Sequence, residues 1–290
     1  MSKNVGIIFA GGTGQRMGLK DIPKQFVMIE KKPIIIHTLE LFENHEEIDE
    51  IYISCIESWI GHLNKLIEKY KITKVKSVVS GGKTGQESIY NALIEARKYC
   101  ADDDVVLIHD GVRPLITSNL ISEVIKSTKE NGNGITSTAC FETIVINNNN
   151  KKVGYVPFRK DTYSVQAPQA FLLKDIIDVH DEIRKDNPTY ENMIDSCTMC
   201  KVLGKELYMV QGNRGNIKVT TPEDVFVLEG LFKFKKSEGM IEVPNFIPNE
   251  LQAIYGENGD VESKFIKIGE EIKKGIKKVI GNESKKESET

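Results

Sequence analysis

Short apolar runs alternate with segments of helical periodicity along the first half of the chain. The apolar runs have the length of buried strands and lie at 4–10, 50–55, 74–80, 104–110 and 134–139. Between them, apolar residues recur every three to four positions, which predicts helices at 33–45, 59–70, 87–100 and 119–132. The last helix is expected to stop at Gly132. This alternation predicts parallel βαβ units, with helices on both faces of the sheet.

The pattern changes after residue 140. Segment 142–158 alternates apolar and polar positions and turns at four asparagines, which predicts a β-hairpin arm. After the arm, the pattern predicts helices at 173–185 and 191–203 and strands at 206–211 and 216–221. A further helix is expected to begin at the sequence TPEDV, with Thr221 as its N-cap, Pro222 in its first position and Asp224 completing a capping box.

The composition shifts again near residue 240, where the chain becomes loop-like. We therefore predict one α/β domain over 1–240, with an arm at about 142–165, and a C-terminal extension over 241–290. Within the extension, apolar residues form a stripe among lysines at 264–281, which predicts an amphipathic helix. Such a helix either packs on its own domain or frays, or it contacts a partner or a membrane surface.

Charge and cysteine content narrow the function classes. The net charge is only −3, so no global basic field favours nucleic acid and any anion site must be local. No apolar run reaches the length of about 20 residues that a membrane span needs, and the N-terminus lacks a secretory cleavage pattern. Five scattered cysteines are typical of a reducing cytoplasm. Cys197 and Cys200 form a C-x-x-C without a second pair, which favours two helical cysteines over a zinc site.

A glycine loop follows the first predicted strand directly, in the sequence GGTGQRMGLKDIPKQF. It is not a dinucleotide fingerprint, because Met17 stands where the third glycine belongs, and it is not a P-loop, because no G-K-[ST] follows. What remains is two adjacent glycines followed by Arg16 and Lys24. The loop and the later sequence HDGVRP both follow carboxyl ends of predicted parallel strands, where such sheets bind ligands. A glycine turn with two surface cations is the alternative.

Five blocks together resemble one family of cytidylyltransferases that form CDP-alditols. They are AGGTGQRMG…PKQF, SGGKTGQESI, HDGVRP, VPFRKDTYSVQAPQAF and GNIKVTTPEDV. The resemblance covers about residues 4–235 and implies a Rossmann-like nucleotidyltransferase fold, a mostly parallel twisted sheet with a projecting β-arm. Members join CTP to an alditol phosphate, and the two branches use methylerythritol 4-phosphate and ribitol 5-phosphate. The arm of this family reaches a partner subunit, so a homodimer is implied.

The resemblance also implies roles for individual residues. Arg16 and Lys24 correspond to the transition-state stabilisers, and Arg159 and Lys218 to the residues that place the substrate phosphate. The positions that match the CTP contacts are Phe9, Ala10, Gly11, Gly12, Gly81, Gly82, Glu87 and Ser88. The positions that match substrate contacts are Asp110, Arg113, Thr143 and Asp195. The chemistry agrees, since joining two polyanions depends on positioning and cationic stabilisation rather than on a covalent nucleophile.

Asp110 is the candidate ligand for a divalent metal. It ends an apolar strand beside His109 and Arg113, and a carboxylate there suits Mg²⁺ bound to a triphosphate, which needs few protein ligands. The alternative is a capping role in the following turn. We interpret His109 as a packed histidine, because a substrate phosphate is already ionised and needs no general base.

Three positions depart from the family pattern. Gly85 stands where members commonly have an arginine, which puts one CTP contact in doubt. Ala167 stands where many members have threonine, and Ile194 stands where the methylerythritol branch has threonine. The loss of two hydroxyls favours the ribitol branch, with CTP and D-ribitol 5-phosphate as substrates. The methylerythritol enzyme of isoprenoid synthesis stays open as an alternative. So does a silent nucleotide-binding module tethered by the C-terminal helix, although a module need not keep four transition-state and substrate-phosphate cations.

Overall fold

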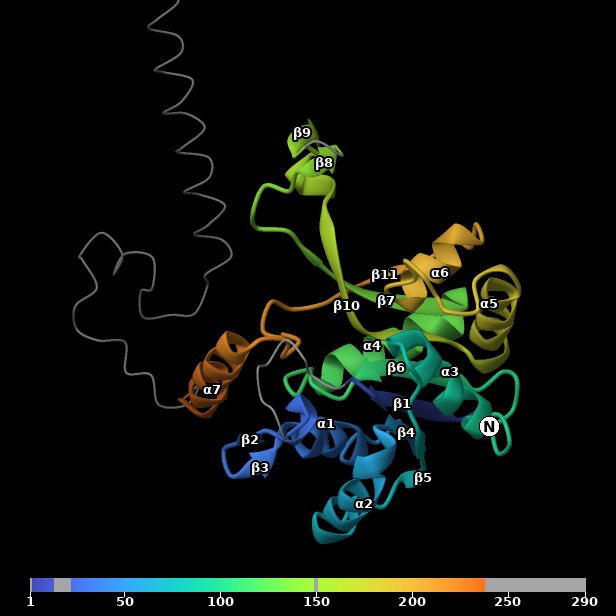
Figure 1. The fold of residues 1–290 in the computed structure, drawn as a ribbon, viewed down its shortest axis with the longest axis vertical. Coiled ribbons are helices and arrows are strands. Elements are labelled where there is room, and N and C mark those ends of the chain that lie inside the picture. The colour runs from blue at the N-terminus through green and yellow to red at the C-terminus, as the bar shows by residue number, and fades with distance from the viewer. Residues whose placement is uncertain (1, 13–21, 149–150, 238–290) are drawn as a thin grey trace, which may run out of the picture. The chain divides into compact units, whose positions relative to one another are not determined.

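The computed structural model describes residues 2–12, 22–148 and 151–237 (Figure 1). Arg16 and the predicted helix at 264–281 lie outside the described residues. The chain divides into two units, Met1–Phe232 and Lys233–Thr290, and the architecture below is that of the first unit. The predicted domain boundary at residue 240 stays a prediction.

A seven-stranded sheet forms the centre of the described fold, in the order β11-β7-β10-β6-β1-β4-β5. Its strands are β1 (Asn4–Ala10), β4 (Glu50–Cys55), β5 (Val75–Ser80), β6 (Val105–Asp110), β7 (Asn133–Ala139), β10 (Tyr163–Leu172) and β11 (Met209–Gln211). β10 is antiparallel to both β6 and β7, and the other neighbouring pairs are parallel. The predicted mostly parallel α/β sheet is therefore confirmed.

Helices cover both faces of the sheet (Figure 1). One face packs against α1 (Ile34–Glu43), α2 (Ile60–Lys69) and α4 (Ser118–Asn131). The other packs against α3 (Gly85–Ala96), α5 (Leu173–Asp186) and α6 (Ser196–Val202). Ile8 faces the first layer, whereas Val5 and Ile7 face the second. Because both faces are covered, β1 is an almost continuous apolar run rather than an alternating one.

The predicted hairpin is present as two short antiparallel strands, β8 (Ile146–Asn148) and β9 (Lys152–Tyr155). Residues 149–150 between them are outside the described part. β8 and β9 stand apart from the central sheet, at the end of the long strand β10 (Figure 1). The remaining small elements are β2 (Met28–Ile29), β3 (Lys32–Pro33) and the 3₁₀ turns η2 (Lys24–Phe26), η3 (Glu57–Trp59) and η4 (Arg159–Asp161).

Helix ends follow the sequence signals where these were strong. α4 ends at Gly132, which has the left-handed φ of +82° that glycine tolerates best. α7 (Pro222–Ser237) begins at the predicted proline, and the Asp224 carboxylate accepts the backbone N–H groups of Thr220 and Thr221 at 2.7 and 2.8 Å. The predicted capping-box aspartate therefore caps this helix.

The structure differs from the predicted elements at three places. The strand β10 was not predicted at all. Segment 216–221 is irregular rather than a strand, because its backbone bonds to loops: Val219 N–H donates to Val112 O at 3.1 Å. The helix predicted at 191–203 is only α6, because Tyr190 and Asn192 have positive φ angles and Asp195 caps the helix one residue before it begins.

Candidate active site

The site lies where β1 and β6 end side by side. Phe9 of β1 pairs with Asp110 of β6, and the next strand of the central sheet along the chain, β4, pairs with β1 on the opposite side. The order of connections therefore reverses between β1 and β6, which is where open α/β sheets bind ligands. Two adjoining pockets open here, and both are lined by Phe9, Gly85, Asp110 and Lys218.

We call the first of these the glycine pocket. Its lining contains the backbone of the predicted CTP-binding loops together with Lys24, Lys83 and Lys218. The second, which we call the amide pocket, is lined by polar side chains of Gln86, Gln166, Gln169 and Asp195, with Ala167 and Ile194 among its apolar residues.

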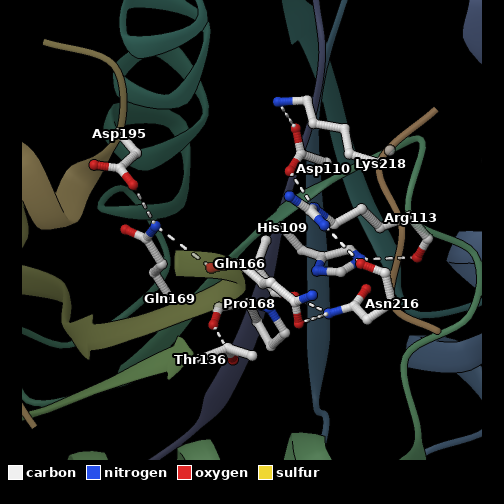
Figure 2. A network of polar contacts seen from close by, with 12 residues as sticks. His109, Asp110, Arg113, Thr136, Gln166, Pro168, Gln169, Asp195, Asn216 and Lys218 are labelled. Carbon is white, nitrogen blue, oxygen red and sulfur yellow. Dashed lines mark hydrogen bonds and ion pairs between the residues drawn. The ribbon is translucent and has the colours of Figure 1, made fainter. Parts of the chain in front are cut away.

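Asp110 lies at the boundary of the two pockets and pairs with two cations (Figure 2). Arg113 Nε lies 2.9 Å from Asp110 Oδ2, and Lys218 Nζ lies 2.5 Å from Oδ1. Burial alone would raise the pKa of Asp110, but the charges and hydrogen bonds of Lys218 and Arg113 outweigh it and lower the pKa to about 2. The carboxylate is therefore ionised at neutral pH and fixes both cations.

Asn216 and His109 both form hydrogen bonds with Arg113 of this cluster (Figure 2). Arg113 Nη1 donates to the Asn216 carbonyl at 2.7 Å, and the fully buried Asn216 amide donates to Ala167 O at 2.7 Å. His109 Nε2 lies 3.1 Å from Arg113 O, and burial lowers the pKa of His109 to about 4, so the ring is neutral. His109 is packed, as the sequence predicted. Asn216 was not predicted, since no sequence signal separates a buried amide from an exposed one.

The two glycine loops of the glycine pocket fit closely against each other. A Cβ atom at Gly11 would lie 2.4 Å from Ser88 Oγ, and one at Gly82 would lie 2.2 Å from Glu87 Cγ. Ser88 Oγ accepts the Gly82 N–H at 3.0 Å, and Glu87 Oε2 accepts the Lys83 N–H at 2.6 Å. Four of the predicted CTP residues thus shape the loop, and only glycine fits at the two closest positions.

Gly85 differs from these glycines. A Cβ atom there would meet nothing within 4 Å, although the residue lines both pockets. The position where the family commonly has an arginine is therefore open space in this chain, and a longer side chain would project into the boundary between the pockets.

Lys24 begins η2 and lines the glycine pocket. Its Nζ donates to Val219 O at 3.0 Å, one residue beyond Lys218. The structure thereby brings Lys24, Lys218, Asp110 and Arg113 to one end of the sheet, as the sequence predicted for a site for anions. Arg16 belongs to the part of the loop outside the described residues.

Asp195 lines the amide pocket and also caps α6. Its Oδ1 accepts the Thr198 N–H at 2.8 Å, and its Oδ2 accepts from Gln169 Nε2 at 3.1 Å (Figure 2). Ile194 is 86% exposed beside it. Cys197 and Cys200 lie on α6 as predicted, and burial raises the pKa of these thiols to about 11 and about 12, so neither is an activated nucleophile.

Thr143 and Arg159 are not brought to this site within one chain. Thr143 lies just before β8, Arg159 begins η4, and both are exposed. Neither belongs to the described lining of the two pockets, which Lys218 does line. If Arg159 and Lys218 bind one substrate phosphate, as the sequence predicts, Arg159 has to come from the arm of a second subunit.

The described residues do not fit a magnesium ion held by the protein itself. Both oxygens of Asp110 already accept from cations, and no group of three or more His, Cys, Asp or Glu residues in the described ranges could hold a metal. A metal at this point would depend on ligands from a bound triphosphate. The metal-binding role of Asp110 stays a prediction.

A glycine-loop pocket with converging cations at the switch point of an α/β sheet defines a nucleotide-binding transferase site. The sequence model described as "IspD: 2-C-methyl-D-erythritol 4-phosphate cytidylyltransferase" matches residues 5–233, and the chain belongs to this family of cytidylyltransferases. The predicted family and enzyme class are confirmed.

Individual relatives divide between two substrates. The chain is 43% identical over 235 residues to a ribitol-5-phosphate cytidylyltransferase of Streptococcus agalactiae serotype III, with 81% of this chain and 98% of the relative covered. It is 44% identical over 228 residues to the Vibrio parahaemolyticus protein of that name, covering 79% and 95%. A 2-C-methyl-D-erythritol 4-phosphate cytidylyltransferase of Clostridium botulinum is 40% identical, covering 80% and 99%.

Solved structures agree on the fold. The 4-diphosphocytidyl-2C-methyl-D-erythritol synthase of Anaerococcus prevotii superposes with a TM-score of 0.69 at 26% identity, covering 80% of this chain and 96% of that one. In the described part of the present chain, no helix is both long and apolar enough to cross a bilayer.

Proposed function

We propose that this protein transfers the cytidylyl group of CTP to D-ribitol 5-phosphate, giving CDP-ribitol and pyrophosphate. The observation that supports this substrate most directly is the similarity, over nearly their whole length, to relatives named ribitol-5-phosphate cytidylyltransferase. The open amide pocket adds to it, because Ala167 and Ile194 offer no hydroxyl where the methylerythritol branch has threonine.

In the proposed reaction, a phosphate oxygen of the alditol phosphate attacks the α-phosphorus of CTP. A new P–O bond forms as the bond to the bridging oxygen of pyrophosphate breaks, and the electron pair leaves with pyrophosphate. CTP occupies the glycine pocket, and the polyol chain occupies the amide pocket, where amides and Asp195 offer hydrogen bonds to hydroxyls. The reacting groups then meet at the shared boundary beside Lys218.

Most of the catalytic roles in this proposal belong to cationic side chains, which bind the phosphates and stabilise the transition state. Lys24 and Arg16 stabilise the charge that develops on the phosphoryl oxygens, because preorganised cations need no reorientation during the reaction. Lys218 holds the attacking phosphate while it stays paired with Asp110, since an ammonium group has three donors. Asp110 and Arg113 set the position of Lys218. Phe9, Ala10 and the glycines provide the backbone surface for the cytidine.

Mg²⁺ accompanies the triphosphate in this proposal and supplies charge neutralisation there. No step is assigned to it, because Asp110, the carboxylate at the boundary of the two pockets, is already paired with Arg113 and Lys218. The expected place of the reaction is the cytoplasm, which is consistent with five unpaired cysteines.

We further propose a homodimer in which the arm of one subunit supplies Thr143 and Arg159 to the cleft of its partner. Two facts support it. The arm and its base expose Val153, Tyr155 and Phe158, and an isolated two-stranded hairpin is barely stable in water. Contact of the C-terminal helix with a partner or a membrane surface stays a prediction on residues outside the described part.

The second candidate is 2-C-methyl-D-erythritol 4-phosphate cytidylyltransferase activity. The family match and the Clostridium botulinum relative support it. Both candidates use the same CTP chemistry and the same cations, so they differ only in the amide pocket.

A substrate panel tests the proposal. Pyrophosphate release is followed with CTP, Mg²⁺ and either phosphate in turn, and kcat/KM should favour ribitol 5-phosphate by more than about tenfold, or about 1.4 kcal/mol. Equal or better use of methylerythritol phosphate would reverse the choice of substrate. CTP binding without release of its pyrophosphate in the presence of any alditol phosphate would instead support the silent binding module.

A further inference from the structure

The proposed function requires Lys24 to stay at a fixed place in the glycine pocket. Lys24 belongs to η2, which has only three residues. A single 3₁₀ turn has no stability of its own, because nucleation costs more than one turn of hydrogen bonds returns. Contacts outside the turn therefore have to hold it, and the two residues that follow Lys24 make such contacts.

Gln25 attaches η2 to the end of β1. Its side chain is 1% exposed, and its Nε2 donates to the carbonyl of Ala10 at 2.7 Å. Ala10 is the last residue of β1 and precedes the glycine loop. This hydrogen bond fixes one side of the turn against the strand from which the CTP-binding loop begins.

Phe26 attaches the other side of η2 to a different part of the fold. Its buried ring stacks on Trp59, with centroids 4.6 Å apart and planes 23° from parallel. The ring of His62 meets both edge-on, with centroids 5.4 Å from Phe26 and 5.3 Å from Trp59. Trp59 ends η3, His62 lies in the first turn of α2, and Trp59 is the only tryptophan of the chain. Pairs in such geometry are attractive and directional.

We propose that Trp59 is a positioning residue for cytidylyl transfer, which acts on Lys24 through the stacked ring of Phe26. This inference rests on the proposed function for the role of Lys24. Trp59 is not in the described lining of either pocket, so the role proposed for it is an indirect one. It holds the turn that presents the lysine, and Lys24 in turn bonds to Val219 beside Lys218. Loss of the stack would free the turn and move the ammonium group away from the triphosphate.

The first experiment replaces the stacking ring with a smaller side chain that is still apolar. Trp59→Leu should lower kcat on the order of tenfold to a hundredfold, because small misplacements of a catalytic group have effects of that size. The KM for the alditol phosphate should stay within about twofold. Trp59→Phe, which can still stack, should restore most of kcat. Phe26→Leu should reproduce the loss of kcat from the other side of the contact.

Ile67→Ala is the matched control. Ile67 lies two turns further along α2 and packs on the same core cluster, without a ring contact to Phe26. It should lower the melting temperature but leave kcat within about twofold of the wild type. If Ile67→Ala lowered kcat as much as Trp59→Leu, stability of α2 and not the stack would be the cause, and the inference would fail.

A double-mutant cycle separates positioning from stability. Once Lys24 is replaced by alanine, Trp59→Leu should change kcat by less than about twofold, because the group that it positions is gone. Multiplicative losses in the double variant would overturn the inference. So would a kcat for Trp59→Leu close to that of the wild type.

The wild type, Lys24→Ala, Trp59→Leu and the double variant also test the inference if the proposed function fails. Should the wild type release no pyrophosphate with any alditol phosphate, CTP affinity is measured by calorimetry instead. Lys24→Ala and Trp59→Leu should then weaken CTP binding non-additively. Additive effects on CTP affinity would overturn the role of Trp59 independently of the substrate.

Discussion

The cleft and the arm differ in how far one chain completes them. At the cleft, the charged groups are fixed within the chain: the Asp110 side chain is 7% exposed and pairs with both Arg113 and Lys218. At the arm and its base, apolar side chains face solvent, with Phe158 73% and Val153 62% exposed. Burial of exposed apolar side chains is favourable, so contact of the arm with another protein surface would be stabilising.

This difference explains why the predicted site residues fall into two groups. Lys218 and Asp110 lie in the cleft, whereas Arg159 and Thr143 lie on the arm. The prediction from sequence places all four at one substrate, whereas only Lys218 and Asp110 belong to the described pocket linings. A site that spans two subunits would reconcile the two facts, and the experiments below test each region in turn.

The largest expected effect is on the stability of the cleft. Asp110→Asn removes the shared carboxylate charge and leaves Arg113, whose side chain is 12% exposed, without its counter-ion. Removing one partner of a buried pair costs about 3–5 kcal/mol, and urea denaturation should show a loss of this size. Asp178→Asn is the control, because Asp178 and its partner Lys174 are both 51% exposed and such exposed pairs contribute little to stability. Equal losses in the two variants would contradict a buried anchoring role for Asp110.

The next effect is on catalysis in the cleft. Lys24→Ala should lower kcat by about 10²–10³, or about 3–4 kcal/mol, with the fold intact. Arg16→Ala should do the same. Lys65→Ala removes an exposed lysine of α2 outside the described pocket linings and should leave kcat unchanged. Near-normal kcat at saturating CTP in Lys24→Ala would remove Lys24 from the proposed mechanism.

The arm is tested by mixing two inactive proteins. Lys218→Ala damages the cleft and Arg159→Ala damages the arm, so each homodimer should lack an intact site. In a mixed dimer, one cleft with Lys218 meets one arm with Arg159. Random exchange in a two-fold dimer should therefore restore about a quarter of wild-type activity. Absence of any recovery after subunit exchange, or sedimentation as a monomer at micromolar concentration, would contradict the shared site.

The sequence predicted the parallel strands of the central sheet better than the antiparallel strand β10 that lies among them. Strands such as β1 and β6 are buried on both faces, and this burial makes them recognisable as apolar runs. β10 was missed because it contains Pro168, which argues against a strand interior. In the structure, the ladder to β7 is irregular between Val165 and Gln169, so the missing N–H of the proline lies where regular pairing is interrupted.

The candidate site shows the same limit. Lys24 and Lys218 were predicted because they match blocks of the cytidylyltransferase family, and Asp110 was predicted because it ends an apolar strand. Gln25 and Asn216 were not, although both are almost fully buried and bond to backbone carbonyls of other segments. An amide in a sequence looks the same whether it is solvated or buried, so its positioning role follows only from the tertiary structure.

Lowering the pH should destabilise the body of the fold through a buried histidine, which the arm lacks. The segment 142–165 contains no histidine, whereas His180 on α5 is fully buried with its Nδ1 2.9 Å from Tyr190 Oη. Burial, with the nearby Arg184 charge, lowers the pKa of His180 to about 3. Because the unfolded chain binds this proton near pH 6.5, stability is full above that pH and falls as the pH drops toward 3. Between about pH 7.5 and pH 5 this group should lower the free energy of unfolding by about 2 kcal/mol.

Urea denaturation of the wild type and of His180→Gln at both pH values measures this contribution. Glutamine keeps a polar group beside Tyr190 and does not titrate, so the quantity to compare is the change in stability between the two pH values rather than stability itself. That change should be smaller in the variant by about 2 kcal/mol. His109 is also buried and neutral, and it should leave part of the acid sensitivity in place. Identical pH dependence in the two proteins would show that His180 is charged or solvated in the native state, contrary to its burial between α3 and α5.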